Sequence, residues 1–217
     1  MPLIIYRSNP PISLPLSTLR DLVQFNQPPS TWETPPAPPS RRCLNAVCAG
    51  RANCVAFPSD PLYQASWVKP YNLGVPVKPV AVFRPNNASD VSAAVICAST
   101  NGVTVQAKSG GHSYANFGLA GDGGLMIDLQ YLQDFSMDTS SWQATFGAGH
   151  RLGDLDKKLH ANGNRAMAHG TCPGVGIGGH ATIGGIGPSS RMWGTALDHV
   201  LEVEVVTADG KIQPLAS

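Results

Sequence analysis

Glycine is unusually dense between residues 170 and 187. Eight glycines fall within these eighteen residues, whereas average glycine usage is about 7 %. They are Gly170, Gly174, Gly176, Gly178, Gly179, Gly184, Gly185 and Gly187. Because a residue without a side chain lets another group approach the backbone closely, we expect a second surface to lie against this segment.

A second loop of small residues comes earlier, in the run Lys108-Ser109-Gly110-Gly111-His112-Ser113-Tyr114. Each loop contains one nucleophilic side chain, His112 here and Cys172 in the segment His169-Gly170-Thr171-Cys172-Pro173. Backbone amides of a glycine loop can approach a phosphate, and a ring nitrogen or thiolate held beside an electrophilic ring can bond to it covalently. The two loops together predict a cofactor that is tethered to the protein.

Composition excludes several classes of partner. The 217-residue chain is 42 % hydrophobic, which is enough for a packed core. Charged residues make up only 13 % and the net charge is +1, so the basic surface of a nucleic-acid-binding protein is missing. No apolar run approaches the roughly 20 residues that span a bilayer. We therefore expect a soluble protein without nucleic-acid or membrane partners, and we expect it to be a monomer.

The first 42 residues differ from the rest of the chain. They hold ten of the nineteen prolines, which disfavour helix interiors and central strands, so we expect a poorly ordered, extended arm. A secretory signal is not convincing, because Leu3-Ile4-Ile5 is followed at once by Arg7 and prolines. Residues 43–217 are expected to form the folded domain, with a core of about 75–214.

Cysteine usage points to an oxidising compartment. Cys43, Cys48 and Cys54 fall within twelve residues, a clustering that favours disulfides over free buried thiols or a zinc site. If Cys172 is reserved for the cofactor, four cysteines remain and can pair in three ways. We favour Cys43 with Cys97, and Cys48 with Cys54. A glycosylation sequon at Asn87-Ala88-Ser89 also fits a secreted protein.

The pattern from residue 78 onward alternates between strands and helices. One helix is expected after Ser89 as its cap, with an end near Asn101. Its apolar stripe comprises Val91, Ala94, Val95 and Ala98, with Cys97 at the edge. A second helix carries Leu152, Leu155 and Leu159 and is closed by Gly163. The expected strands are residues 80–83, 103–107, 125–129, 135–137 and 143–146, and a hairpin from 200–207 that turns at Asp209-Gly210 and returns through Ile212.

The strand at 103–107 runs directly into the loop that contains His112. This loop should therefore lie at the carboxyl end of a strand, where ligands commonly bind. The whole pattern predicts an α+β or mixed α/β fold.

The sequence disfavours three other kinds of site. Residues 176–181 match the G-x-G-x-x-A dinucleotide pattern, with Asp198 at a suitable distance, but no hydrophobic strand precedes them. The six histidines form no short metal-ligand pair, so no metal site is predicted. Cys172 with His169 or His180 would make a thiol nucleophile and base, a reading that leaves the His112 loop unexplained.

Three motifs resemble the FAD-binding domain of the berberine-bridge-enzyme-like oxidases, with the fungal oligosaccharide oxidases as the nearest branch. They are the run from Lys108 to Tyr114, the stretch from Gly163 to His180, and Ser190-Arg191-Met192-Trp193-Gly194 with Leu197-Asp198-His199-Val200. The resemblance covers about residues 43–214. It implies a PCMH-type, vanillyl-alcohol-oxidase-like fold, in which two α+β subdomains hold FAD between them.

The resemblance also assigns residues to the cofactor. It implies bicovalent FAD, bonded from His112 to the 8α-methyl group and from Cys172 to C6 of the isoalloxazine. The backbone of both loops is expected to contact the pyrophosphate and the ring. The expected cofactor-binding residues are therefore His112, Cys172, Ser109, Gly110, Gly111, Ser113, Gly176, Gly178, Gly179 and His180.

Two further positions resemble family residues near the substrate. Tyr114 resembles a residue that faces the reacting hydroxyl and assists its deprotonation; the alternative is an ordinary core tyrosine. Val175 resembles the position that controls dioxygen access, where a small valine favours an oxidase over a dehydrogenase.

The resemblance implies a secreted FAD-linked oxidase. An alcohol or hemiacetal of a carbohydrate would lose a hydride to the flavin, and O2 would reoxidise the flavin and form H2O2. One alternative is a secondary-metabolite or hydroxynicotine-type oxidase. A second is a truncated, inactive flavin-binding remnant, since relatives are about twice as long and we expect the substrate domain to be missing.

Overall fold

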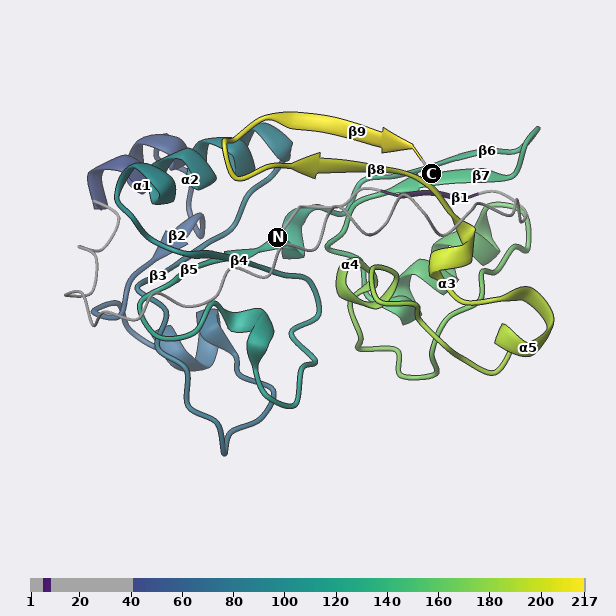
Figure 1. Cartoon of the computed structure of the whole chain (residues 1–217), viewed down its shortest axis with the longest axis horizontal. Coiled ribbons are helices and arrows are strands. Elements are labelled where there is room, and N and C mark those ends of the chain that lie inside the picture. The colour runs from purple at the N-terminus through teal and green to yellow at the C-terminus, as the bar shows by residue number, and fades with distance from the viewer. Residues whose placement is uncertain (1–5, 9–40, 217) are drawn as a thin grey trace, which may run out of the picture.

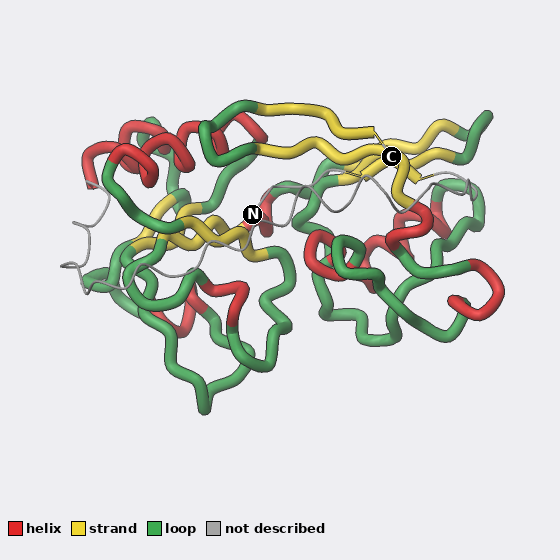
Figure 2. Tube along the Cα trace, viewed as in Figure 1, coloured by secondary structure: helices red, strands yellow, loops and turns green. Residues whose placement is uncertain are grey.

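The structure is a computed structural model that describes residues 6–8 and 41–216. Two lobes, each built on its own sheet, lie side by side (Figures 1 and 2). The first lobe has the sheet order β2-β3-β5-β4, and the second has β6-β7-β1-β8-β9. This arrangement confirms the predicted α+β class.

The first lobe comprises α1 (Arg41–Cys48), β2 (Val55–Ala56), η2 (Tyr63–Val68), β3 (Ala81–Phe83), α2 (Ala88–Thr100), β4 (Val105–Lys108), η3 (Phe117–Leu119), β5 (Leu125–Asp128) and η4 (Leu129–Tyr131). Strands β3 and β4 both pair with β5 in parallel, and β2 is an antiparallel edge strand. Because β3, β5 and β4 are parallel, their carboxyl ends meet on the same side of the sheet.

The second lobe comprises β1 (Tyr6–Ser8), β6 (Phe135–Asp138), β7 (Gln143–Phe146), α3 (Leu152–Ala161), α4 (Ile177–His180), α5 (Ser190–Trp193), η5 (Leu197–His199), β8 (Val200–Val206) and β9 (Ile212–Ala216). All strand pairs in its sheet are antiparallel.

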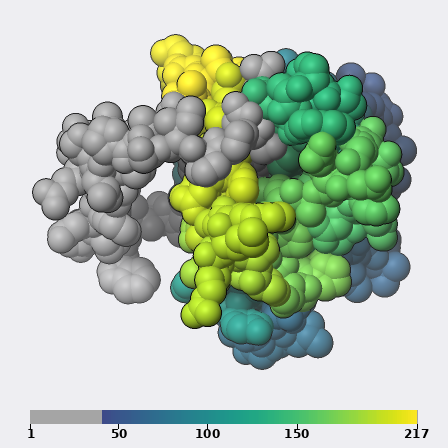
Figure 3. All heavy atoms as spheres, turned by 90° about the vertical axis from the view of Figure 1, so that its right-hand side faces the viewer, coloured from purple at the N-terminus to yellow at the C-terminus, as the bar shows by residue number. Residues whose placement is uncertain are grey.

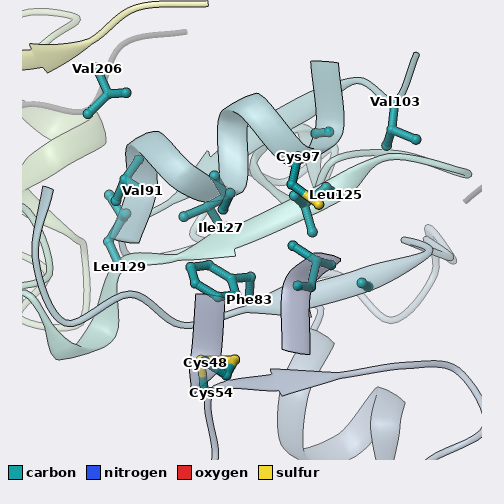
Figure 4. Close-up of a cluster of buried hydrophobic side chains, with 14 of the residues drawn as sticks. Cys48, Cys54, Phe83, Val91, Cys97, Val103, Leu125, Ile127, Leu129 and Val206 are labelled. Carbon is teal, nitrogen blue, oxygen red and sulfur yellow. A yellow bond between two sulfur atoms is a disulfide. The ribbon is translucent and has the colours of Figure 1, made fainter. Parts of the chain in front are cut away.

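Helix α2 packs its predicted stripe onto the first sheet. Val91, Ala94 and Cys97 are buried against side chains such as Phe83 and Ile127 (Figure 4). The expected cap at Ser89 is wrong: Asn87 is the cap, and its side chain accepts a hydrogen bond from the backbone N–H of Asp90 at 2.9 Å. Asparagine and serine cap equally well, so only the backbone path decides between them.

Two disulfides join α1 to the rest of the first lobe. Cys43 is bonded to Cys97 on α2, and Cys48 is bonded to Cys54 just before β2. This is the pairing favoured from the sequence. Cys172 is a free, exposed thiol.

Helix α3 supplies much of the core of the second lobe. Its predicted stripe of Leu152, Leu155 and Leu159 is buried and packs with Phe146 of β7 and Ile177 of α4. The helix ends at Ala161, slightly earlier than the sequence suggested. The segment that carries α5 projects on the surface that faces the viewer in Figure 3, and it exposes apolar side chains.

The β8–β9 hairpin extends from the second lobe to the first (Figure 1). Its turn lies against α2, where Ser92 Oγ donates a hydrogen bond to the carbonyl of Gly210 at 2.5 Å. Val206, at the end of β8, belongs to the core of the first lobe. The hairpin therefore ties the two lobes together.

The expected N-terminal arm lies mostly outside the described residues. Within it, however, Tyr6–Ser8 forms β1 between β7 and β8, and Arg41 begins α1. This short stretch contains no proline, so its N–H groups can pair with neighbouring strands. Among the described residues, no helix has the length and apolar character needed to span a bilayer.

Candidate functional site

The His112 loop lies at the carboxyl ends of the three parallel strands, above a group of buried charges. Arg84 follows β3, Asp128 ends β5 and Lys108 ends β4, and all three side chains are buried. The carboxylate of Asp128 lies 3.3 Å from Arg84 Nε and 3.7 Å from Lys108 Nζ. Burial lowers the pKa of Lys108, and the negative charge of Asp128 opposes that shift.

Sequence reasoning missed Arg84 and Asp128 as parts of the site. A signal was present, because each is a charged residue at the end of a hydrophobic strand next to the one that carries the His112 loop. The three side chains form a rigid base for the loop that follows Lys108.

The loop itself presents a row of unpaired backbone donors. Gly111 has φ +68°, a conformation that favours glycine. Among the described residues, nothing accepts a hydrogen bond from the backbone N–H of Gly110, Gly111, His112 or Ser113. Successive N–H groups without protein acceptors suit an anion such as a pyrophosphate.

The His112 loop is the surface that lies against the glycine-rich segment of residues 170–187. A Cβ on Gly176 would lie 2.0 Å from the backbone nitrogen of Gly110 and 2.2 Å from Ser109 Oγ, so no side chain fits there. Ser109 Oγ also donates to the carbonyl of Ala148 at 2.6 Å and accepts from the N–H of Gly178 at 3.3 Å. Gly179, by contrast, faces open space. Ser109, Gly176 and Gly178 therefore join the loops, a role that sequence reasoning did not foresee.

His112 projects to the point where the loops meet. Its Nε2 lies 3.0 Å from the position that a Cβ on Gly174 would occupy, and Gly174 is two residues after Cys172. Its ring packs against Tyr71, with centroids 4.3 Å apart. Burial lowers the pKa of His112, and the positive charge of Arg151 lowers it further. The imidazole is therefore kept neutral, which leaves a nitrogen lone pair free to act as a nucleophile.

Tyr71 was missed by sequence reasoning, and no local motif marks it. Its ring links His112 to Tyr114, whose ring centroid lies 5.8 Å away from that of Tyr71. Tyr114 is 77 % exposed, so it is not the core tyrosine that was the alternative reading. These three rings form an exposed aromatic group beside the loop.

The Cys172 loop is held through its backbone. The N–H of Val175 donates to the carbonyl of Cys172 at 3.2 Å and closes a turn. The N–H of Gly170 donates to His180 Nε2 at 2.9 Å, so His180 must be unprotonated at that nitrogen. Burial lowers the pKa of His180, and His169 lowers it further. His180 thus holds the loop that carries Cys172.

The described residues do not assemble the three rival sites considered from the sequence. His169 is hydrogen-bonded to Asp156 at 2.7 Å and His180 to the N–H of Gly170, so no described contact makes either ring a base for Cys172. Gly176 precedes the four-residue helix α4 rather than linking a strand to a long helix, and a dinucleotide loop requires the latter. Within residues 6–8 and 41–216, no group of three or more metal-ligating side chains occurs.

Comparison with known proteins identifies the ligand class. Residues 79–216 match the model of a family described as an FAD binding domain. FAD-linked oxidoreductase sorD of Penicillium rubens is 46 % identical over 170 residues, which cover 78 % of this chain and 36 % of that protein. The chain thus spans about a third of the length of this relative.

Solved structures show the same fold. Xylooligosaccharide oxidase from Myceliophthora thermophila, in complex with xylobiose, has a TM-score of 0.75 and 37 % identity over 81 % of this chain and 36 % of its own. Glucooligosaccharide oxidase from Acremonium strictum, described with 6-S-cysteinyl, 8α-N1-histidyl FAD, has a TM-score of 0.71 and 36 % identity over 80 % of this chain and 36 % of its own. The paired glycine loops, the PCMH-type fold and the family match lead to one assignment: this chain belongs to the FAD-binding domains of the berberine-bridge-enzyme-like oxidases.

Proposed function

We propose that this chain is the FAD-binding part of a carbohydrate oxidase and that it holds FAD through two covalent bonds, from His112 and from Cys172. The observation that carries the proposal is the meeting of the two loops, because His112 Nε2 lies beside Gly174 of the turn that begins at Cys172. The related glucooligosaccharide oxidase has an FAD with one histidyl and one cysteinyl bond.

The residues present fit this cofactor. The unpaired N–H groups of residues 111–113 suit the pyrophosphate, whereas the backbone nitrogen of Gly110 is packed against Gly176. The neutral ring of His112 suits attack on the 8α-methyl group, and the exposed thiol of Cys172 is free to bond to C6. Each bond would replace one C–H of the flavin and one N–H or S–H of the protein, and O2 would take up the two electrons and two protons as H2O2.

In the oxidation reaction, bound FAD would accept a hydride from the carbon of an alcohol or hemiacetal and would pass the electrons to O2, giving H2O2. The protein orients the cofactor and the substrate. Tyr114 is exposed beside His112, where it is a candidate to accept a hydrogen bond from the substrate hydroxyl. Val175, half-buried in the turn after Cys172, is the candidate for control of O2 access.

Carbohydrate is the proposed substrate class, since both solved relatives described above are oligosaccharide oxidases. A secondary-metabolite oxidase is the second candidate, because sorD, which is 46 % identical to this chain, is an FAD-linked oxidoreductase whose name gives no carbohydrate substrate. We further propose a secreted monomer: the two disulfides fit an oxidising compartment, and Asn87 of the sequon is exposed.

Mass spectrometry of the denatured chain tests the covalent bonds. After production with FAD, the mass should rise by that of one FAD, and peptides containing residues 112 and 172 should both carry flavin. His112→Ala and Cys172→Ala should each retain flavin through the other bond, and the double variant should lose it. Denatured wild-type protein without flavin would contradict the proposal and support the inactive remnant.

Peroxide release tests the substrate class. The flavin-loaded chain, and any longer product of the same reading frame, would be assayed on xylo-, chito- and gluco-oligosaccharides and on a panel of alkaloids and phenols. Peroxide formed with oligosaccharides supports a carbohydrate oxidase. Peroxide formed only with the second panel would replace it with the secondary-metabolite alternative.

A further inference from the structure

One side-chain nitrogen of Arg151 is hydrogen-bonded to both the His112 loop and the Cys172 loop. This residue is the N-cap of α3, but its side chain makes no capping hydrogen bond. Instead Nη1 donates to the carbonyl of Gly110 at 2.5 Å and to the carbonyl of Gly174 at 2.9 Å. One carbonyl belongs to the His112 loop and the other to the Cys172 loop.

The backbone around Arg151 reinforces the link to the second loop. Arg151 forms a β-bridge with Gly176, and the N–H of Leu152 donates to the carbonyl of Val175 at 2.9 Å. The buried stripe of α3 fixes the helix in the core of the second lobe. Arg151 is therefore a fixed point from which the guanidinium reaches across to the first lobe.

We propose that Arg151 is the positioning residue that holds the His112 loop and the Cys172 loop at the separation at which one flavin ring reaches both side chains. This inference rests on the proposed function, because it assigns a role in forming the two bonds. An arginine suits the role, since its planar group donates to several acceptors in fixed directions.

The charge of Arg151 adds a second effect. It lowers the pKa of His112 beyond the lowering that burial causes, and so favours the neutral, nucleophilic ring. The buried cations below this loop, Arg84 and Lys108, lie 3.3 Å and 3.7 Å from the carboxylate of Asp128. The ring of Tyr71 packs against His112. Among the described residues, no carboxylate forms an ion pair with His112. Arg151 is thus the charged residue that acts on His112.

Two variants distinguish the hydrogen bonds from Arg151 to both loops, here called the clamp, from the effect of its charge. Arg151→Gln removes the charge and shortens the side chain, whereas Arg151→Lys keeps the charge but cannot donate with the same planar geometry. Arg165→Gln is the matched control, because it removes an arginine of the same lobe whose guanidinium stacks on Trp142, 3.6 Å from the ring centroid.

The first measurement needs no flavin. In the chain purified without FAD, hydrogen exchange of two hydrogen-bonded amides reports the clamp: Val175 in the Cys172 turn, and Gly178, which donates to Ser109 of the His112 loop. NMR titration of isotope-labelled histidine reports His112. Arg151→Gln should speed exchange at both amides at least about threefold and raise the pKa of His112. Arg151→Lys should speed exchange but leave the titration near that of the wild type. Unchanged exchange in both variants would overturn the proposal.

The second measurement follows FAD attachment to the purified chain between pH 5 and 8. Arg151→Gln should reduce the share of molecules with both bonds about tenfold or more, since small displacements of reacting groups cost large factors in rate. In a Cys172→Ala background, the pH midpoint for the His112 bond should move upward in Arg151→Gln and stay in place in Arg151→Lys.

The two proposals fail in different ways. Absence of flavin in the wild type contradicts the proposed function, while the exchange measurement still decides whether Arg151 clamps the loops. Normal double attachment in Arg151→Gln, with the same pH profile as Arg165→Gln, would leave the function intact and overturn the role of Arg151.

Discussion

The two loops that meet at His112 are supported in different ways. The His112 loop follows a parallel strand, sits above the buried charges of Arg84, Lys108 and Asp128, and belongs to a lobe with two disulfides. The Cys172 loop is exposed, and its backbone is held by side-chain hydrogen bonds from Arg151 and to His180. The backbone N–H groups of Leu152 and Gly153 at the start of α3 also donate to the carbonyls of Val175 and Pro173. Among the described residues, the lobe of the Cys172 loop has no disulfide.

This difference indicates that the two lobes have different roles. In the first lobe, buried charges support the loop that carries His112. In the second lobe, the loop that carries Cys172 is held by backbone hydrogen bonds from α3 and by side-chain contacts of Arg151 and His180, which a substitution can remove. We therefore expect changes in the first lobe to affect global stability, and changes in the second to affect mainly the bond from Cys172.

The largest effect is expected from Asp128→Asn. The substitution leaves Arg84 and Lys108 buried without a counter-charge, and breaking such a buried pair costs about 3–5 kcal/mol. Urea unfolding measures the loss. The control is Asp154→Asn, which breaks the exposed pair with Lys157 and should change stability by less than about 1 kcal/mol. Equal losses of stability in both variants would contradict the idea that the buried charges support the His112 loop.

The two disulfides should contribute unequally to the free energy of unfolding. Cys43 and Cys97 are 54 residues apart and Cys48 and Cys54 only 6, and chain entropy then predicts losses of about 4 and about 2 kcal/mol when each pair is changed to alanine. Unfolding of the two double variants tests the order. A larger loss for the short loop would show that strain or packing, rather than loop length, sets their value.

Gly176→Ala should push the His112 loop and the Cys172 loop apart, whereas Gly179→Ala, three positions along the chain, should not. The new methyl group would lie 2.0 Å from the nitrogen of Gly110, whereas at Gly179 it meets nothing within 4 Å. Overpacking of this kind costs about 1–3 kcal/mol. Thermal unfolding and the share of doubly bonded flavin should fall only in Gly176→Ala. Similar behaviour of both variants would contradict the loop contact.

Mild acid should loosen the second lobe, with the smallest effect of the four. Burial lowers the pKa of His150 and of His180, so above about pH 6.5 both are neutral in the folded and unfolded states. Below that pH the unfolded chain takes up protons first, and stability falls. Urea unfolding at pH 7.5 and 5.5 measures the loss.

Substitution of His180 assigns its share of this loss. His180→Gln keeps an acceptor for the N–H of Gly170 but does not titrate, so its stability should depend less on pH. His160→Gln, which changes an exposed histidine on α3, is the control. The same pH dependence in all three proteins would exclude His180 as the titrating group.

Local features of the chain were predictable from sequence. Strands β3 to β9, the buried stripes of α2 and α3 and the position of the His112 loop follow from hydrophobic period and turn residues, which act over a few positions. The short strands β1 and β2 were not predicted. The glycine-rich segment correctly indicated a close backbone contact, but its partner was the other loop.

Contacts between distant segments were not predictable in this way. Arg151 reaches Gly110 across 41 positions and Arg84 reaches Asp128 across 44, and no local pattern encodes such pairs. Tyr71 lies in an irregular segment, so its contact with His112 depends on the tertiary fold alone.

The place of β1 has a consequence for synthesis on the ribosome. Tyr6 emerges early, yet its partners are Phe146 on β7 and Val203 on β8, which emerge much later. Apart from the β8–β9 hairpin, the elements on which α1 and α2 pack in the first lobe lie between residues 41 and 131 and emerge far sooner. We therefore expect the nascent chain to build the lobe that carries His112 first, while β1 waits unpaired for the strands that enclose it.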